Sequence, residues 1–170
     1  MHMTYTRQQK ILHWVLAVLL LFWLFVSGEL VEEAEGDQKL FILAIHSGGA
    51  VVILGLMIWR YMIRRAHPVQ AMDSLKPWEK TWSSRVHLLL YLLVAVMVGS
   101  GLLQGIFFEM PIKVAGLIPI TVSHNEALME PFHEIHEITG TLLKVFIGLH
   151  ILAALKHQFI DKQPFIKRMF

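Results

Sequence analysis

Histidine is the residue type that could carry chemistry in this chain. The 170 residues include ten His and no Cys. Without thiols the protein has no disulfides, iron–sulfur clusters, thiolate zinc sites or covalently attached c-type haem. His13, His46, His87 and His150 lie inside long apolar stretches, where an ionisable side chain is costly and indicates function. At any one of these positions, a hydrogen-bonded structural histidine is the alternative.

The spacing of three histidines near the C-terminus defines a helical stripe. His136 and His150 are 14 positions apart (150 − 136), which is about 40° short of four turns at about 100° per residue. They therefore share one helix face, about 21 Å apart along the axis. His157 continues this face about 10 Å further along.

The directions of the other helices predict which histidines pair. His13 lies near the start of the first apolar stretch and His46 near the start of the second, which runs in the opposite direction. His13 should therefore share the depth of His150, and His46 the depth of His136. Neutral imidazole is a strong axial ligand of haem iron, and two imidazoles saturate it. The pattern predicts two bis-histidine b haems, one above the other across a membrane.

Two further histidines have open roles at the depth of the inner pair. His87 either replaces one of the ligands, hydrogen-bonds a haem propionate or contacts a quinone. His157 either hydrogen-bonds a quinone carbonyl and passes a proton, or is a surface residue beside Lys156. Glycines near the paired histidines fit the close approach of a flat ligand, although they equally fit helix–helix contact; they are Gly48, Gly49, Gly140 and Gly148.

A bare metal site is the competing interpretation at the outer end. His133 and His136, together with Glu134 and Glu137, resemble a metal-ligand cluster in spacing. However, His133 is 17 positions from His150 (150 − 133) and points off the stripe, so we expect an interfacial residue. The remaining histidines, His2, His67 and His124, are expected to be solvated in a tail or loops.

The elements that must position these side chains are membrane helices. Hydrophobic residues make up 55% of the chain and charged residues 16%, against about 25% charged residues in soluble domains, and the mean hydropathy is +0.56. A membrane helix needs about 20 apolar residues, and the stretches 11–30, 40–63, 86–108 and 135–160 qualify. We predict an all-α integral membrane protein, a single four-helix domain over 1–170. Residues 11–30 are too long, and lack the cleavage site, for a removable leader.

The charges predict the orientation. The two terminal segments and residues 60–85 carry most of the Lys and Arg, with Asp73, Glu79 and Asp161 as their acids, whereas the opposite side has Lys39 and Lys113 against ten acids. The positive-inside rule places both termini in the cytoplasm. Because the basic residues flank apolar stretches, nucleic acid is not an expected partner. The loop 109–134 is long enough to cap a site.

Several motifs resemble the bacterial cytochrome b561 family over nearly the whole chain. They begin with Tyr5–Thr6–Arg7 and His13–Trp14, and the stretch from Gly148 to His157, followed by Arg168–Met169, is the most specific. Other matching positions are His46, Trp59–Arg60, Lys76–Pro77, His87 with Tyr91, and the run from Pro111 to Pro119.

This resemblance implies a bacterial inner-membrane cytochrome with two haem b groups, ligated by His13 with His150 and by His46 with His136. Within the family the chain looks most like members that take electrons from superoxide on the periplasmic side and pass them to ubiquinone, giving O2 and quinol. Their quinone pocket maps onto His157, Leu16 and Ala17.

Three functions remain as hypotheses, and the first is the oxidation of superoxide with reduction of ubiquinone. Superoxide is an anion, so the acidic outer loops would steer it away unless Lys39 or Lys113 forms a local positive entrance. The first alternative is a b-type subunit that exchanges electrons between a periplasmic redox partner protein and the quinone pool. The second is a membrane transporter or scaffold without redox chemistry.

Overall fold

The computed structural model describes residues 4–170, which form helices and one small two-stranded sheet. The first span is continuous through α1, η1 and α2, and the last continues from α5 into η2. The elements are α1 (Arg7–Phe22), η1 (Trp23–Ser27), α2 (Gly28–Glu33), α3 (Gly36–Ala66), α4 (Pro77–Ile106), β1 (Lys113–Val114), β2 (Ile118–Pro119), α5 (Glu126–Leu155), η2 (Lys156–Ile160) and η3 (Lys167–Met169).

Four helical segments of the described chain are long and apolar enough to cross a membrane, as predicted, and they have 27, 31, 30 and 35 residues. All four start before their predicted apolar stretches, because hydropathy does not detect the polar residues of a first helical turn, whereas α4 ends at Ile106, two residues before the predicted end at 108. Thr6 and Gln9 form a capping box at α1, and the Asn125 side chain accepts from the Leu128 N–H at α5. Pro131, which we expected in a loop, therefore lies in the second turn of α5.

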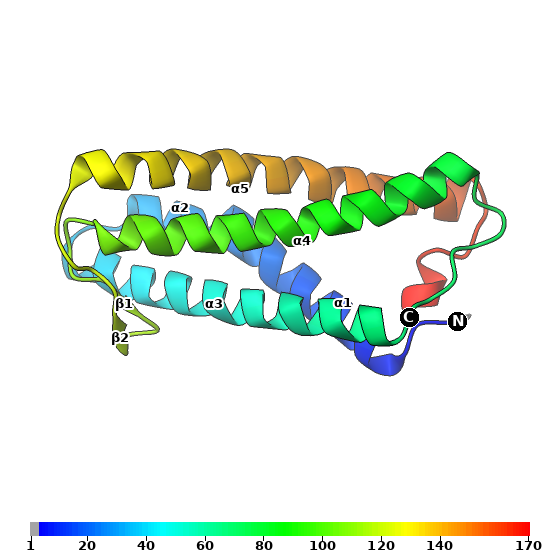
Figure 1. The fold of residues 1–170 in the computed structure, drawn as a ribbon, viewed down its shortest axis with the longest axis horizontal. Coiled ribbons are helices and arrows are strands. Elements are labelled where there is room, and N and C mark those ends of the chain that lie inside the picture. Colours follow the sequence, from blue (N-terminus) through cyan, green and yellow to red (C-terminus); the bar gives the residue numbers. More distant parts are fainter. Residues whose placement is uncertain (1–3) are drawn as a thin grey trace.

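The spans form an elongated antiparallel bundle (Figure 1). One end, hereafter the termini end, carries both chain termini and the connection between α3 and α4. The other end, hereafter the hairpin end, carries the α2–α3 turn and the small sheet of β1 and β2. Both termini therefore lie on the same side of the bundle, as an even number of spans requires.

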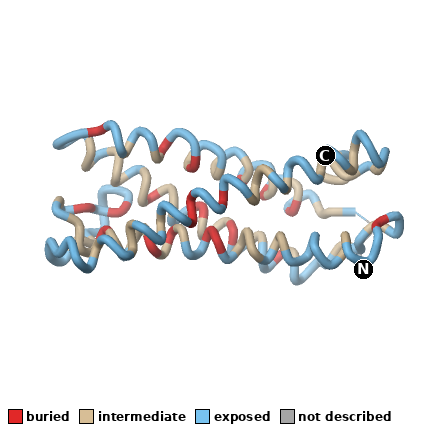
Figure 2. Tube along the Cα trace, turned by 90° about the horizontal axis from the view of Figure 1, so that it is seen from above, coloured by how far each residue is buried: buried red, intermediate tan, exposed pale blue. Residues whose placement is uncertain are grey.

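Apolar side chains fill the centre of the bundle and also cover its outside. Leu143 is 1% exposed and Val94 is 2% exposed, and both belong to the central core with Leu16, Leu24, Ile53, Met57, Leu93 and Val98. Figure 2 shows the buried positions as short interruptions in a largely exposed trace. Val18 and Phe41, 67% and 66% exposed, are among many large apolar side chains on the outside. Lipid, rather than water, suits such a surface.

The connection between α4 and α5 folds over the hairpin end. Val114 pairs with Ile118 in antiparallel register, and the turn between them has positive φ at Ala115 (52°) and Gly116 (72°). The Ala115 N–H donates to the Ala44 carbonyl of α3 at 3.0 Å. The hairpin is thereby fastened to α3.

Candidate cofactor sites

The structure brings His46 of α3 and His136 of α5 together near the hairpin end. Their ring centres are 6.4 Å apart, with an interplanar angle of 64°. Two imidazoles that bind one metal atom from opposite sides, each at about 2 Å through a nitrogen about 1 Å from the ring centre, have centres about 6 Å apart. The spacing therefore fits two residues that would hold one haem iron between them.

Hydrogen bonds orient both rings for this role. The Nδ1 of His136 lies 2.9 Å from the Met97 carbonyl oxygen, and because a carbonyl only accepts, Nδ1 must carry the proton. The Nε2 lone pair is then the one available to a metal, as is common for ligating histidines. The Nδ1 of His46 lies 2.8 Å from the Ser27 hydroxyl, so its other ring nitrogen, Nε2, is the one that could bind a metal.

A π-helical segment of the first span provides two contacts to His46. η1 begins at Trp23 and ends at Ser27. The Trp23 indole donates to the His46 carbonyl at 3.0 Å, and Ser27 contacts the imidazole of the same residue. Single-turn π segments occur frequently at functional sites, because the extra residue re-aims the neighbouring side chains.

A cavity of about 280 Å³ lies between the two histidines and opens toward the hairpin end. Its inner wall includes core residues such as Val94 and Leu143, and residues of the α4–α5 connection, Ile112 and Ile120, cover it. Gly101 of α4 lets His136 occupy its position, because a Cβ atom there would lie 2.9 Å from the ring carbon Cε1. An apolar cavity flanked by two imidazoles is the environment that a b haem requires.

The mouth of this cavity is polar. His133, which we expected to be merely interfacial, lines it; its Nδ1 is 3.0 Å from Gln104 Oε1 and its Nε2 is 3.5 Å from a Glu137 oxygen. Glu32 and Lys39 also line the mouth. Within residues 4–170 no group of three or more His, Asp or Glu side chains is placed to hold a metal ion.

A second pair lies toward the termini end. His13 of α1 and His150 of α5 have ring centres 6.3 Å apart and an interplanar angle of 78°. His87 of α4 is closer to His150, at 5.3 Å, and its Nδ1 donates to the Ser83 carbonyl. That distance is shorter than two rings on one iron atom require, so the geometry favours His13 over His87 as the partner of His150.

The surroundings of the four glycines distinguish ligand contact from helix packing. A Cβ atom at Gly48 would meet Ala115 of the hairpin at 2.8 Å, and one at Gly49 would overlap the Trp23 ring. Both residues therefore allow protein packing rather than ligand contact. A Cβ atom at Gly140 would lie 3.3 Å from the Met97 methyl carbon, whereas one at Gly148 would meet nothing within 4 Å.

The remaining candidates lie around the termini end. His157 is in η2, where its Nδ1 lies 2.7 Å from an Asp161 oxygen. Leu16 is 2% exposed in the core, and Ala17, next to it, is half-buried. The Lys144 ammonium lies 5.5 Å from the centre of the Phe25 ring, a cation–π contact outside both histidine pairs. His67 and His124 are exposed, as predicted, while His2 lies outside the described residues.

Sequence reasoning missed the residues that orient the histidines. Ser27 and Trp23 stand out weakly as polar groups in an apolar stretch, but Met97 contributes only its carbonyl and Gly101 only its lack of a side chain. Nothing in their residue types indicates these roles, because the contacts join different helices.

Comparison with known proteins identifies the family of the chain. The family model for prokaryotic cytochrome b561 matches residues 4–170. Cytochrome b561 homolog 2 of Escherichia coli (strain K12) is 31% identical over 126 residues, which are 71% of this chain and 65% of that protein. The chain thus spans slightly less than two thirds of that relative's length. With four spans apolar enough to cross a membrane and a family match over almost its whole length, the chain belongs to the prokaryotic cytochrome b561 family.

Proposed function

We propose that this protein is a di-haem b cytochrome that oxidises superoxide at the hairpin end and reduces ubiquinone at the termini end. The basic residues of the termini end support a cytoplasmic location for that end, in a bacterial inner membrane. In the overall reaction, two superoxide anions each lose one electron, and one ubiquinone takes up two electrons and two protons. The products are two O2 and one quinol.

The observation that carries the proposal is the spacing of the two histidine pairs, 6.4 Å and 6.3 Å between ring centres. His46 with His136, and His13 with His150, would each hold one haem. Bound haems supply one-electron redox chemistry, while the protein sets ligation, burial and access. The apolar layer around Leu143, midway between His136 and His150, separates the two sites and excludes water between them.

The mouth of the hairpin-end cavity supports access of a small donor. Lys39 provides a positive charge there, and His133 adds a hydrogen-bond donor or acceptor. Lys113 is exposed on β1. Glu32 and Glu137 oppose this attraction, so the proposed entrance for superoxide is a local cationic point within an acidic surface.

The termini end supports the quinone site. His157 offers an imidazole that can hydrogen-bond a quinone carbonyl. Leu16 and Ala17 lie on α1, one turn beyond His13; the half-buried Ala17 offers an apolar contact for the ring or tail, whereas Leu16 is buried in the central core. Electrons would thus leave the protein on the side from which protons are taken up.

The acidic character of the hairpin end favours a second candidate function. Ten acidic residues lie on that side against Lys39 and Lys113, and such a field attracts a basic redox protein more strongly than it attracts an anion. In that case the chain exchanges electrons between a periplasmic partner and the quinone pool.

A rapid optical measurement separates these functions. Purified, oxidised protein is mixed with a pulse of superoxide, and the b-haem bands are followed with and without ubiquinone. Fast reduction of the haem by superoxide, followed by its re-oxidation when ubiquinone is present, supports superoxide oxidation. Haem that superoxide does not reduce but quinol does reduce supports the partner-dependent function. A protein without haem bands refutes both functions.

A further inference from the structure

We propose that Asp161 is a positioning residue that orients and charges His157 as the proton donor to the bound quinone. The inference rests on the proposed quinone site and assigns a role to a residue outside it. Asp161 follows the last membrane span directly, and its carboxylate is the one charged group bonded to the His157 ring among the contacts of the described chain.

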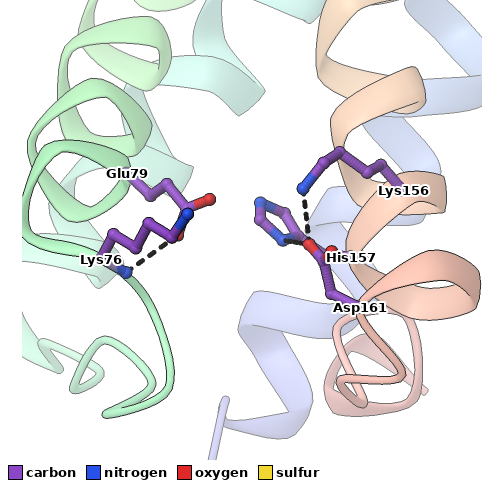
Figure 3. Close-up of polar contacts among 5 residues, drawn as sticks. All are labelled: Lys76, Glu79, Lys156, His157 and Asp161. Atoms are coloured by element: carbon purple, nitrogen blue, oxygen red, sulfur yellow. Dashed lines mark hydrogen bonds and ion pairs between the residues drawn. The ribbon is translucent and has the colours of Figure 1, made fainter.

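The contacts at this corner are short and specific. One Asp161 oxygen, Oδ2, lies 2.7 Å from His157 Nδ1 and 2.7 Å from the Lys156 ammonium. In Figure 3 the imidazole extends from η2 toward the side on which Lys76 and Glu79 lie at the start of α4. The carboxylate thus holds one edge of the ring, and Nε2 remains for a ligand on the other edge.

The local backbone conformation brings Asp161 and Phe165 to the His157 ring. η2 has π-helical geometry from Lys156 to Ile160, and the Asp161 N–H donates to the Lys156 carbonyl at 3.1 Å. Lys162 then adopts a left-handed conformation, φ 54°, and the chain turns back. Phe165 consequently stacks on His157, with ring centres 4.5 Å apart and planes 18° apart. The ring is therefore fixed from two sides.

The two side chains of the pair differ in their exposure to water. The side chain of His157 is 14% exposed and that of Asp161 is 27% exposed, so the carboxylate lies nearer to water than the ring does. The hydrogen bonds from Lys156 and then from His157 hold the pKa of the exposed Asp161 carboxyl below its ordinary value. An ionised carboxylate accepts only, so Nδ1 of His157 carries a proton.

This arrangement specifies the proton step. Protonated His157 gives its Nε2 proton to a quinone oxygen as that oxygen gains electron density, and becomes neutral imidazole that keeps the Nδ1 proton. A proton from cytoplasmic water then reloads Nε2. The charged groups at this corner are Asp161 and Lys156 beside His157, and Glu79 and Lys76 at the start of α4. Each quinol needs two such transfers, together with the two electrons from the proposed reaction.

The test follows re-oxidation of the dithionite-reduced holoprotein by ubiquinone-1 between about pH 5 and about pH 8, the range in which histidine titrates. General acids contribute about 10²- to 10⁴-fold, so Asp161→Ala should slow re-oxidation at least tenfold. Asp161→Asn keeps an acceptor without the charge, and its rate should fall to half at a lower pH than in the wild type. Asp161→Glu should restore most of the rate.

Lys156→Gln is the matched control, because it removes the other partner of the same oxygen and leaves the Asp161–His157 bond. It should not reduce the rate, and all variants should keep the wild-type haem spectrum. An Asp161→Ala protein with the wild-type rate and pH profile overturns this inference and leaves the proposed function intact. A wild-type protein that ubiquinone-1 fails to re-oxidise overturns both.

Discussion

Replacing Gly101 with alanine tests whether His136 is an iron ligand or only a hydrogen-bonded residue. The new Cβ atom would lie 2.9 Å from Cε1 and 3.1 Å from Nδ1 of the imidazole. Ordinary contact between such atoms is about 3.5–4.0 Å, so the ring must retreat by about 0.6–1.1 Å. Metal–ligand distances tolerate about 0.2 Å.

The consequence depends on what the ring binds. A histidine without a metal can move this far at little cost, because it is a side chain that pivots within a half-buried site. An axial ligand cannot, and perturbing the groups that orient such ligands costs about 10- to 100-fold in metal affinity. We therefore expect Gly101→Ala to lose or weaken the haem at the hairpin end while the haem at the termini end remains.

The assay is the haem-to-protein ratio together with a redox titration of the b-haem bands. Gly99→Ala is the matched control, because it lies two positions away on α4 and a Cβ atom there would meet nothing within 4 Å. The control should keep two haems per chain, and Gly101→Ala should approach one. If Gly101→Ala keeps both haems with unchanged potentials, His136 does not ligate iron in the geometry described.

Three further predictions concern the surroundings of the sites. Ser27→Ala removes the hydroxyl 2.8 Å from His46 Nδ1, and we expect about 10- to 100-fold weaker haem retention at the hairpin end, measured by haem loss to an apoprotein acceptor. His87→Ala should keep both haems low-spin by electron paramagnetic resonance; a high-spin signal would instead identify His87 as a ligand. Lys39→Gln should slow haem reduction by superoxide several-fold at low salt, with less effect at high salt, whereas Lys113→Gln should change it less because Lys113 is not part of the cavity mouth. Equal rates for wild type and Lys39→Gln would exclude Lys39 as the entrance.

The sequence determined the architecture and the depths of the histidines. Four apolar stretches of sufficient length permit only membrane helices, because lipid cannot satisfy exposed backbone groups. The alternation of direction then fixes that His13 lies at the level of His150, and His46 at that of His136. These conclusions need only helical periodicity and chain direction, and both are properties of consecutive residues.

Helix ends and their caps were less predictable. Hydropathy detects the lipid-facing part of a helix, whereas Asn125 and Thr6 start their helices in polar sequence. The π segments were not predicted, because one added residue in a turn changes no feature of the hydropathy pattern.

Only the tertiary structure decided which groups surround each imidazole. Ser27, Met97 and Gly101 act on His46 or His136 through a hydroxyl, a carbonyl and a missing Cβ atom, each from another helix. The structure likewise reassigned Gly49 to packing against Trp23 and brought Phe165 back onto His157. Such contacts depend on the rotation and crossing of helices, which are set by the packing of the whole core. Residue types and spacings within one helix therefore indicate that a histidine is functional, but the partners that orient it are decided when the helices pack.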